Sequence, residues 1–139
     1  MDRKRLLKHL VFLMFFLFLA NTVAIKLNWY SLIWYFDIIM HILSGLWVGM
    51  FFLYVFERKE SRPLDVAMFL KVFFATLAIG LLWEVYEFYL YQYLSQIPFD
   101  SVDTVADLFN DVLGSSIAFF YFSKLIMLSS QNKLKYYND

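Results

Sequence analysis

Four long apolar segments constrain the fold of this chain more than any other feature of its sequence. They cover residues 6–25, 32–56, 64–94 and 105–128. A helix needs about 20 apolar residues to cross the ~30 Å hydrocarbon layer of a bilayer, whereas a transmembrane strand alternates apolar and polar residues over about ten. The four segments are continuously apolar. We therefore predict an all-α membrane protein, a single domain over residues 1–139 that forms a bundle of four transmembrane helices.

The composition agrees with this prediction and excludes other classes of protein. Hydrophobic residues make up 62% of the 139 residues and charged residues 17%, whereas soluble domains are about 45–50% apolar and about 25% charged. Twelve basic residues balance twelve acidic ones, so no basic field would attract a nucleic acid. The absence of cysteine excludes disulfides, thiolate metal sites and cysteine nucleophiles. These observations exclude a soluble domain, a disordered chain and a nucleic-acid-binding protein.

Basic residues gather in the segments that would lie on one side of the membrane. They are Arg3, Lys4, Arg5 and Lys8 before the first apolar segment, Arg58, Lys59 and Arg62 between the second and third, and Lys124, Lys133 and Lys135 towards the C-terminus. The positive-inside rule then places both termini in the cytoplasm, and we expect an integral protein of the cytoplasmic membrane of a prokaryote. The alternative for the first segment is a cleavable signal peptide with residues 10–20 as its apolar region.

Ionisable residues interrupt the second, third and fourth apolar segments. They are Asp37 and His41, Glu84 and Glu87, and Asp107 and Asp111. Each pair is three or four residues apart and therefore shares one face of a helix. A charged group at the bilayer centre costs at least ~2.5–3.5 kcal/mol, so such residues indicate a functional site. Glycines follow at helical spacing and would let the helices approach closely, so we expect the polar faces to meet in the outer half of the membrane.

The polar cluster contains acids and one histidine but no lysine or arginine, so protons or a metal ion must neutralise it. Oxygen-rich ligation with one histidine suits Mg²⁺ or Mn²⁺, with Zn²⁺ as an alternative. We predict an outward-facing divalent-metal site whose ligands are Asp37, His41, Glu84, Glu87, Asp107 and Asp111. The roles of two neighbouring residues, Asp103 and Asn110, stay open. Asp103 could equally cap a helix, and Asn110 could form a hydrogen bond between helices.

Two interpretations of the same residues need no metal ion. His41 could be an ordinary hydrogen-bonded core histidine. Alternatively, a Ser-His-Asp triad could use Ser44 or Ser115, although the surplus of acids disfavours it.

Three short motifs resemble those of the YjdF-like small integral membrane proteins and, more distantly, the VanZ-like proteins. They are His41-Ile-Leu-Ser44-Gly45, Trp83-Glu84 with Glu87-Phe88, and Asp103-Thr104-x-x-Asp107 with Gly114. The spacing Asp107-x-x-x-Asp111-x-x-Gly114 is similar to a VanZ signature that has Asn in place of the second acid. The resemblance implies a membrane protein of four to six helices and, through VanZ and glycopeptide resistance, a role in the cell envelope. It assigns no catalytic residues.

Three functions follow as hypotheses. The boldest is a metal-dependent hydrolase or transferase that acts on a lipid-linked phosphate of the membrane, in which the metal polarises the phosphate and His41 or Glu84 acts as the catalytic base. The second is proton or cation transport, for which a homo-oligomer would supply more helices. The third is a non-catalytic VanZ-like envelope or antibiotic-resistance factor that binds a metal or a lipid head group. The sequence leaves open whether the protein is an enzyme.

Overall fold

The structure is a computed structural model, which describes residues 3–60, 65–90, 92–93 and 100–138. This part of the chain is helical and contains no strand. Its helices are α1 (Arg3–Lys26), α2 (Trp29–Leu32), α3 (Phe36–Glu60), α4 (Val66–Leu90) and α5 (Ser101–Asn138). The prediction of an all-α fold is therefore confirmed for the described residues.

Within the described residues, three helices are long and apolar enough to cross a membrane. The candidate spans are Leu6–Lys26 in α1, Phe36–Phe56 in α3 and Val66–Leu90 in α4. α5 is not among them, and Asp107, Asn110 and Asp111 lower the hydropathy of its first half. Three of the four predicted spans are thus confirmed by length and composition. The fourth span and the cytoplasmic position of both termini remain predictions.

The start of the second predicted segment is corrected by a turn in the chain. Asn28 adopts a left-handed conformation with φ 54°, which asparagine tolerates better than most residues, and the single-turn helix α2 follows it. α3 then begins at Phe36 and runs to Glu60, whereas the sequence predicted one helix over residues 32–56. Hydropathy alone does not detect this break, because the residues around it are apolar or aromatic.

Two aspartates mark the beginnings of α4 and α5. The Oδ1 atom of Asp65 accepts a hydrogen bond from the backbone N–H of Met68 at 2.8 Å, and Asp100 Oδ1 accepts one from the N–H of Val102 at 2.9 Å. Both are the side-chain contacts of helix caps. The sequence also predicts a cap at Ser61, before Pro63, and this residue lies outside the part of the chain that the structure describes. α4 ends at Leu90, before the predicted residue 94, and α5 runs on to Asn138, beyond the predicted end at 128.

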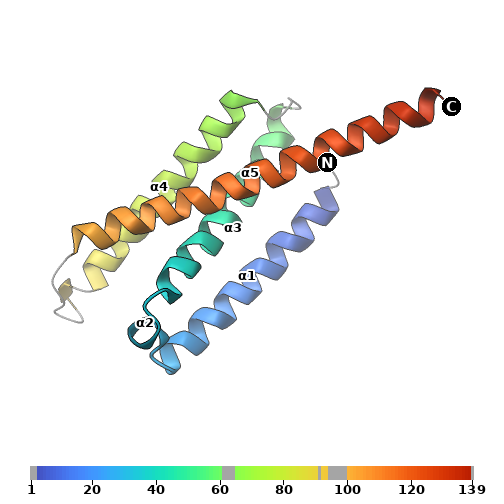
Figure 1. Cartoon of the computed structure of the whole chain (residues 1–139). Helices are drawn as coiled ribbons and strands as arrows, with labels where there is room; N and C mark the ends of the chain where they lie inside the picture. Colours follow the sequence, from blue (N-terminus) through green and yellow to red (C-terminus); the bar gives the residue numbers. More distant parts are fainter. Residues whose placement is uncertain (1–2, 61–64, 91, 94–99, 139) are drawn as a thin grey trace.

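The bundle is built on a close crossing of α3 and α5, which make the most extensive contact between any two helices. α5 lies diagonally across α3 and α4, α1 packs beside α3, and the C-terminal part of α5 extends beyond the other helices (Figure 1). At the crossing, Gly45 lies against the backbone of Asp111, and Gly114 lies against the backbone carbonyl of Ile42. The glycines expected at helix contacts are therefore at those contacts, where a side chain would hold the helices apart.

The interior of the bundle changes character along its length. The half that contains the start of α1 has an apolar core, formed by Leu6, Leu10, Met50, Leu53, Met68, Val72, Ala118, Phe119 and Phe122. α4 contributes one buried stripe with a residue at every fourth position, which runs from Met68 in this core to Glu84 in the polar half. The remaining surface of α4 is mostly exposed and apolar, as expected for a helix in contact with lipid.

Candidate metal centre

The six predicted site residues come from three helices and gather at the end of the bundle opposite the start of α1. Asp37 and His41 lie in the first turns of α3, Glu84 and Glu87 in the last turns of α4, and Asp107 and Asp111 in the first half of α5. The start of α3, the end of α4 and the start of α5 meet at this end of the molecule (Figure 1). The directions of the three helices therefore bring these six residues, which lie far apart in the sequence, to one place.

His41 lies at the centre of the cluster, and both of its ring nitrogens face carboxylates. Its Nδ1 atom is 3.3 Å from Oδ1 of Asp111, at hydrogen-bond distance. Its Nε2 atom is 3.7 Å from Oδ1 of Asp37 and 3.7 Å from Oδ1 of Asp107. The imidazole, Asp107 and Asp111 are all buried. One buried imidazole thus joins acids from α3 and α5.

Four of the predicted ligands have donor atoms close enough to share one ion. His41, Glu84, Glu87 and Asp107 each offer one atom, and these four atoms all lie within 4.8 Å of one another. Two ligands on opposite sides of Mg²⁺ are about 4.2 Å apart, and around Ca²⁺ about 4.6–5.2 Å apart, because the ion–oxygen distances are about 2.0–2.1 and 2.3–2.6 Å. The observed spacing is compatible with a divalent cation at the centre of the four atoms.

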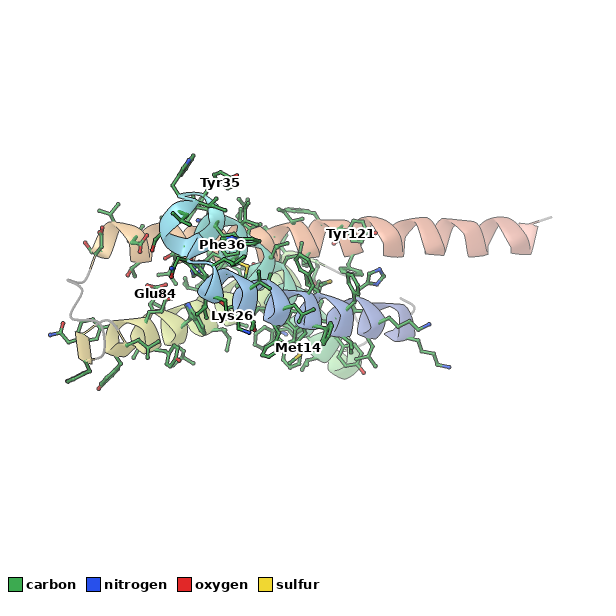
Figure 2. The ribbon with its side chains drawn as sticks, turned by 90° about the horizontal axis from the view of Figure 1, so that it is seen from below. Met14, Lys26, Tyr35, Phe36, Glu84 and Tyr121 are labelled. Atoms are coloured by element: carbon green, nitrogen blue, oxygen red, sulfur yellow. The ribbon has the colours of Figure 1, made fainter. Side chains whose placement is uncertain are left out.

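Glu84 is the acid of this group that has a buried oxygen without a partner. It lies on the inner stripe of α4 and is only 9% exposed. Figure 2 shows it between the ribbons of α4 and α5. The side chain of Thr104 on α5 lies near its carboxyl group, but the Oε1 atom is buried and has no hydrogen-bond partner. A buried oxygen without a partner costs about 1–3 kcal/mol, and more when it is charged, so this atom requires a proton, a cation or a ligand.

A second group of acids adjoins the first and shares one residue with it. Asp37, Asp103 and Asp107 each offer an oxygen within 4.8 Å of the others, and Asp37 and Asp103 are more exposed than Asp107. Asp103, which the sequence left between a cap and a site residue, therefore lies among the site acids, while Asp100 caps α5. The spacing of Asp103 and Asp107, one helical turn apart, is the signal that pointed to this position.

Other sequence-based expectations are placed as follows. Asp111 contacts His41 but belongs to neither group of close donor atoms. Asn110 is buried on α5 outside both groups. Ser115 donates its hydroxyl to the carbonyl oxygen of Val112 at 3.0 Å, which gives no support to a Ser-His-Asp triad built on it. The sequence reasoning missed Thr104, whose only signal is its position one helical turn before Asp107 and Leu108.

Comparison with known proteins places the chain in a family. The family described as "Predicted membrane protein (DUF2238)" matches residues 2–127. No curated protein and no solved structure matches the chain. YjdF is a member of the same family, so the resemblance to YjdF-like proteins is confirmed, whereas the likeness to VanZ stays a prediction. Because the match covers most of its length, this chain belongs to DUF2238, a family of membrane proteins.

Proposed function

We propose that this protein binds a divalent metal ion between α3, α4 and α5 and uses it to bind the phosphate of a membrane lipid. His41, Glu84, Glu87 and Asp107 are the proposed ligands, and Mg²⁺ or Mn²⁺ is the favoured ion, with Zn²⁺ as the alternative. The observation that carries the proposal is the convergence of four donor atoms from three helices within 4.8 Å. The unpartnered Oε1 of Glu84 supports it, because a cation would supply the missing partner.

The charge balance of the group supports a cation rather than a basic side chain as its partner. The four proposed ligands are three acids and one histidine, with no lysine or arginine. An array of carboxylates alone would repel a phosphate. A bound divalent ion removes this repulsion, and coordination positions left open by the protein would accept phosphate oxygens.

The position of the cluster supports a lipid substrate. Exposed aromatic residues lie at the same end of the bundle, with Trp34 81% and Tyr35 48% exposed before α3, and Tyr89 58% and Tyr93 70% exposed around the end of α4. Such rings prefer the membrane–water interface. His41 is five residues after Phe36, where α3 begins, a rise of about 7.5 Å along a helix. This depth supports a position of the proposed ion just below the level of lipid head groups.

The extracytoplasmic side of a prokaryotic cytoplasmic membrane is the proposed location of the site. The basic residues Lys4 and Lys8 lie in the first turns of α1, at the opposite end of the bundle. By the positive-inside rule that end faces the cytoplasm, and the acids then face outward.

A hydrolase or transferase reaction is the activity that we propose for this site. When bound, the ion would polarise the phosphate and lower the pKa of a coordinated water. Glu84 or His41 would accept the proton of the attacking water or hydroxyl. We favour Glu84, because both nitrogens of His41 already face carboxylates, whereas the carboxylate of Glu84 has two oxygens, one that would bind the ion and one that would accept the proton.

Transport of cations and a non-catalytic envelope role are the alternatives. The part of the core that lies beyond the acids is formed by Met50, Leu53, Val72, Phe119 and their apolar neighbours. A cation path through one copy of the described bundle would have to cross this packed apolar layer, which disfavours transport by a monomer. A non-catalytic protein would bind the ion and the lipid phosphate without turnover.

The test is metal-dependent release of inorganic phosphate from phosphatidic acid in mixed micelles. Wild-type protein stripped with chelator and reloaded with Mg²⁺ or Mn²⁺ should release phosphate. Glu84→Gln should lower the rate by at least about 10²–10⁴-fold, because it removes the proposed base and also weakens binding of the ion. Asp65→Asn is the matched control, because it also replaces an acid of the α4 region by its amide, retains the helix cap and lies away from the cluster. Protein that binds metal but releases no phosphate would reject the proposed reaction on this substrate.

A further inference from the structure

We infer that Asp111 is a positioning residue for His41 and does not bind the ion: it holds the imidazole so that Nε2 faces the metal. The inference rests on the proposed metal site and departs from the ligand set predicted from sequence, which included Asp111.

The two nitrogens of His41 have different surroundings. Nδ1 is 3.3 Å from Oδ1 of Asp111, and both residues are buried. Nε2, on the other side of the ring, is 3.7 Å from Oδ1 of Asp107, which is one of the four proposed ligands. A histidine that binds a metal through one nitrogen typically donates the N–H of the other to a carboxylate, which fixes the tautomer and the ring orientation. Asp111 has the position of that carboxylate, and it is absent from both groups of close donor atoms.

Two glycines on different helices lie next to Asp111. Gly45 of α3 lies against the Asp111 backbone, so the backbones of α3 and α5 are in direct contact one turn after His41. Gly80 of α4 lies beside the Asp111 side chain: a Cβ atom at position 80 would be 2.8 Å from Oδ2 of Asp111 and 2.9 Å from Cδ2 of Leu108. The absence of a side chain at Gly80 therefore leaves the space that the Asp111 carboxylate occupies. The Oδ2 atom of Asp111 thus lies toward Gly80 of α4, while its Oδ1 atom faces Nδ1 of His41.

The substitution Asp111→Asn keeps the size of the side chain and changes its hydrogen bonding. Its amide N–H can donate to Nδ1, which favours the tautomer with the proton on Nε2, and that tautomer cannot bind a metal through Nε2. We expect the Kd for Mn²⁺ to rise about 10–100-fold, as is typical when the partner of a metal-binding histidine is lost.

A second variant perturbs Asp111 without changing any titratable group. In Gly80→Ala the new methyl group would displace the ends of two side chains, Asp111 and Leu108, which can rotate without moving the backbone. This variant should fold and should weaken Mn²⁺ binding in the same direction as Asp111→Asn. It keeps the inference testable if Asp111→Asn does not fold.

The decisive readout is ¹⁵N NMR of the histidines with Zn²⁺ as a diamagnetic ion. The chain has two histidines, and a His9→Gln background leaves the signals of His41 alone. In the Zn²⁺ complex we expect a protonated Nδ1 and a metal-bound Nε2, and Asp111→Asn should abolish this pattern. A metal-bound Nδ1, or a weakened Mn²⁺ site with unchanged His41 signals in Asp111→Asn, would overturn the inference. Failure of the wild-type protein to bind either ion would instead reject the metal site itself.

Discussion

The substitution Gly45→Ala adds one methyl group at the crossing of α3 and α5 and tests how the bundle is held together. The new Cβ would overlap the carbonyl oxygen of Asp111 and would lie 2.6 Å from its carbonyl carbon, whereas ordinary van der Waals contact begins at 3.4 Å. The atoms in the way belong to the backbone of a helix and cannot rotate aside. The two helices must therefore move apart, and the contacts on both sides of position 45 weaken together.

The expected loss of folding free energy in Gly45→Ala depends on which atoms the new methyl group displaces. Overpacking a well-packed interior costs about 1–3 kcal/mol, and a backbone clash belongs at the upper end, about 3 kcal/mol. Alanine regains about 1 kcal/mol through its better helix propensity, so Gly45→Ala should destabilise the fold by about 2 kcal/mol. At Gly80 the added methyl meets only the ends of two side chains, and the same gain in propensity should make Gly80→Ala nearly neutral.

The assay is reversible unfolding in mixed micelles of a mild detergent and increasing SDS, followed by tryptophan fluorescence. Both variants replace glycine by alanine in a helix, so Gly80→Ala controls for propensity and for the added volume. A Gly45→Ala protein as stable as wild type, or no less stable than Gly80→Ala, would contradict the close crossing of α3 and α5.

Three further predictions concern topology, coupling and pH. Reporter fusions after Asp139 and within residues 57–63 should be cytoplasmic and a fusion within residues 95–104 exterior; an exterior C-terminus would contradict α5 as a fourth span. Glu84→Gln combined with Asp107→Asn should weaken Mn²⁺ binding little more than either change alone, because both acids serve one ion, whereas additive effects in a titration would indicate separate sites. Lowering the pH from about 7.5 to about 5 should weaken Mn²⁺ binding, because protons compete with the metal for histidine and carboxylates; an affinity independent of pH would argue against these ligands.

The sequence predicts most of the helices, because a membrane-spanning helix is recognised by its length and hydropathy, and both can be measured from the sequence alone. The apolar segments over residues 6–25 and 64–94 correspond to α1 and α4, with ends that differ by a few residues. The break before Phe36 is not visible in hydropathy, because it depends on the left-handed Asn28 and on how α2 turns the chain. Likewise, hydropathy does not set the end of α5, since its polar C-terminal residues continue the helix to Asn138.

The spacing of ionisable residues along the sequence predicts part of the candidate site. Intervals of three and four residues place Asp37 with His41 and Glu84 with Glu87, and topology gives the three helices matching depths. Spacing within one helix does not tell which acids of different helices meet. The separate surroundings of the two His41 nitrogens, the unpartnered oxygen of Glu84 and the space left by Gly80 depend on how α3, α4 and α5 cross. These features decide which acid is a ligand and which one positions the histidine.

Titration of detergent-purified, chelator-stripped protein with Mn²⁺ tests the central claim most directly, with thermal stability measured on the same samples. The account predicts saturable binding to the cluster and a higher melting temperature with metal, because an ion that binds only the folded state stabilises it. Both effects should be much smaller in Glu84→Gln and should be retained in Asp65→Asn. If the wild-type protein binds no Mn²⁺, Mg²⁺ or Zn²⁺, and Glu84→Gln is as stable as wild type at about pH 7, the acids are protonated groups that hydrogen-bond between helices, and the metal site does not exist.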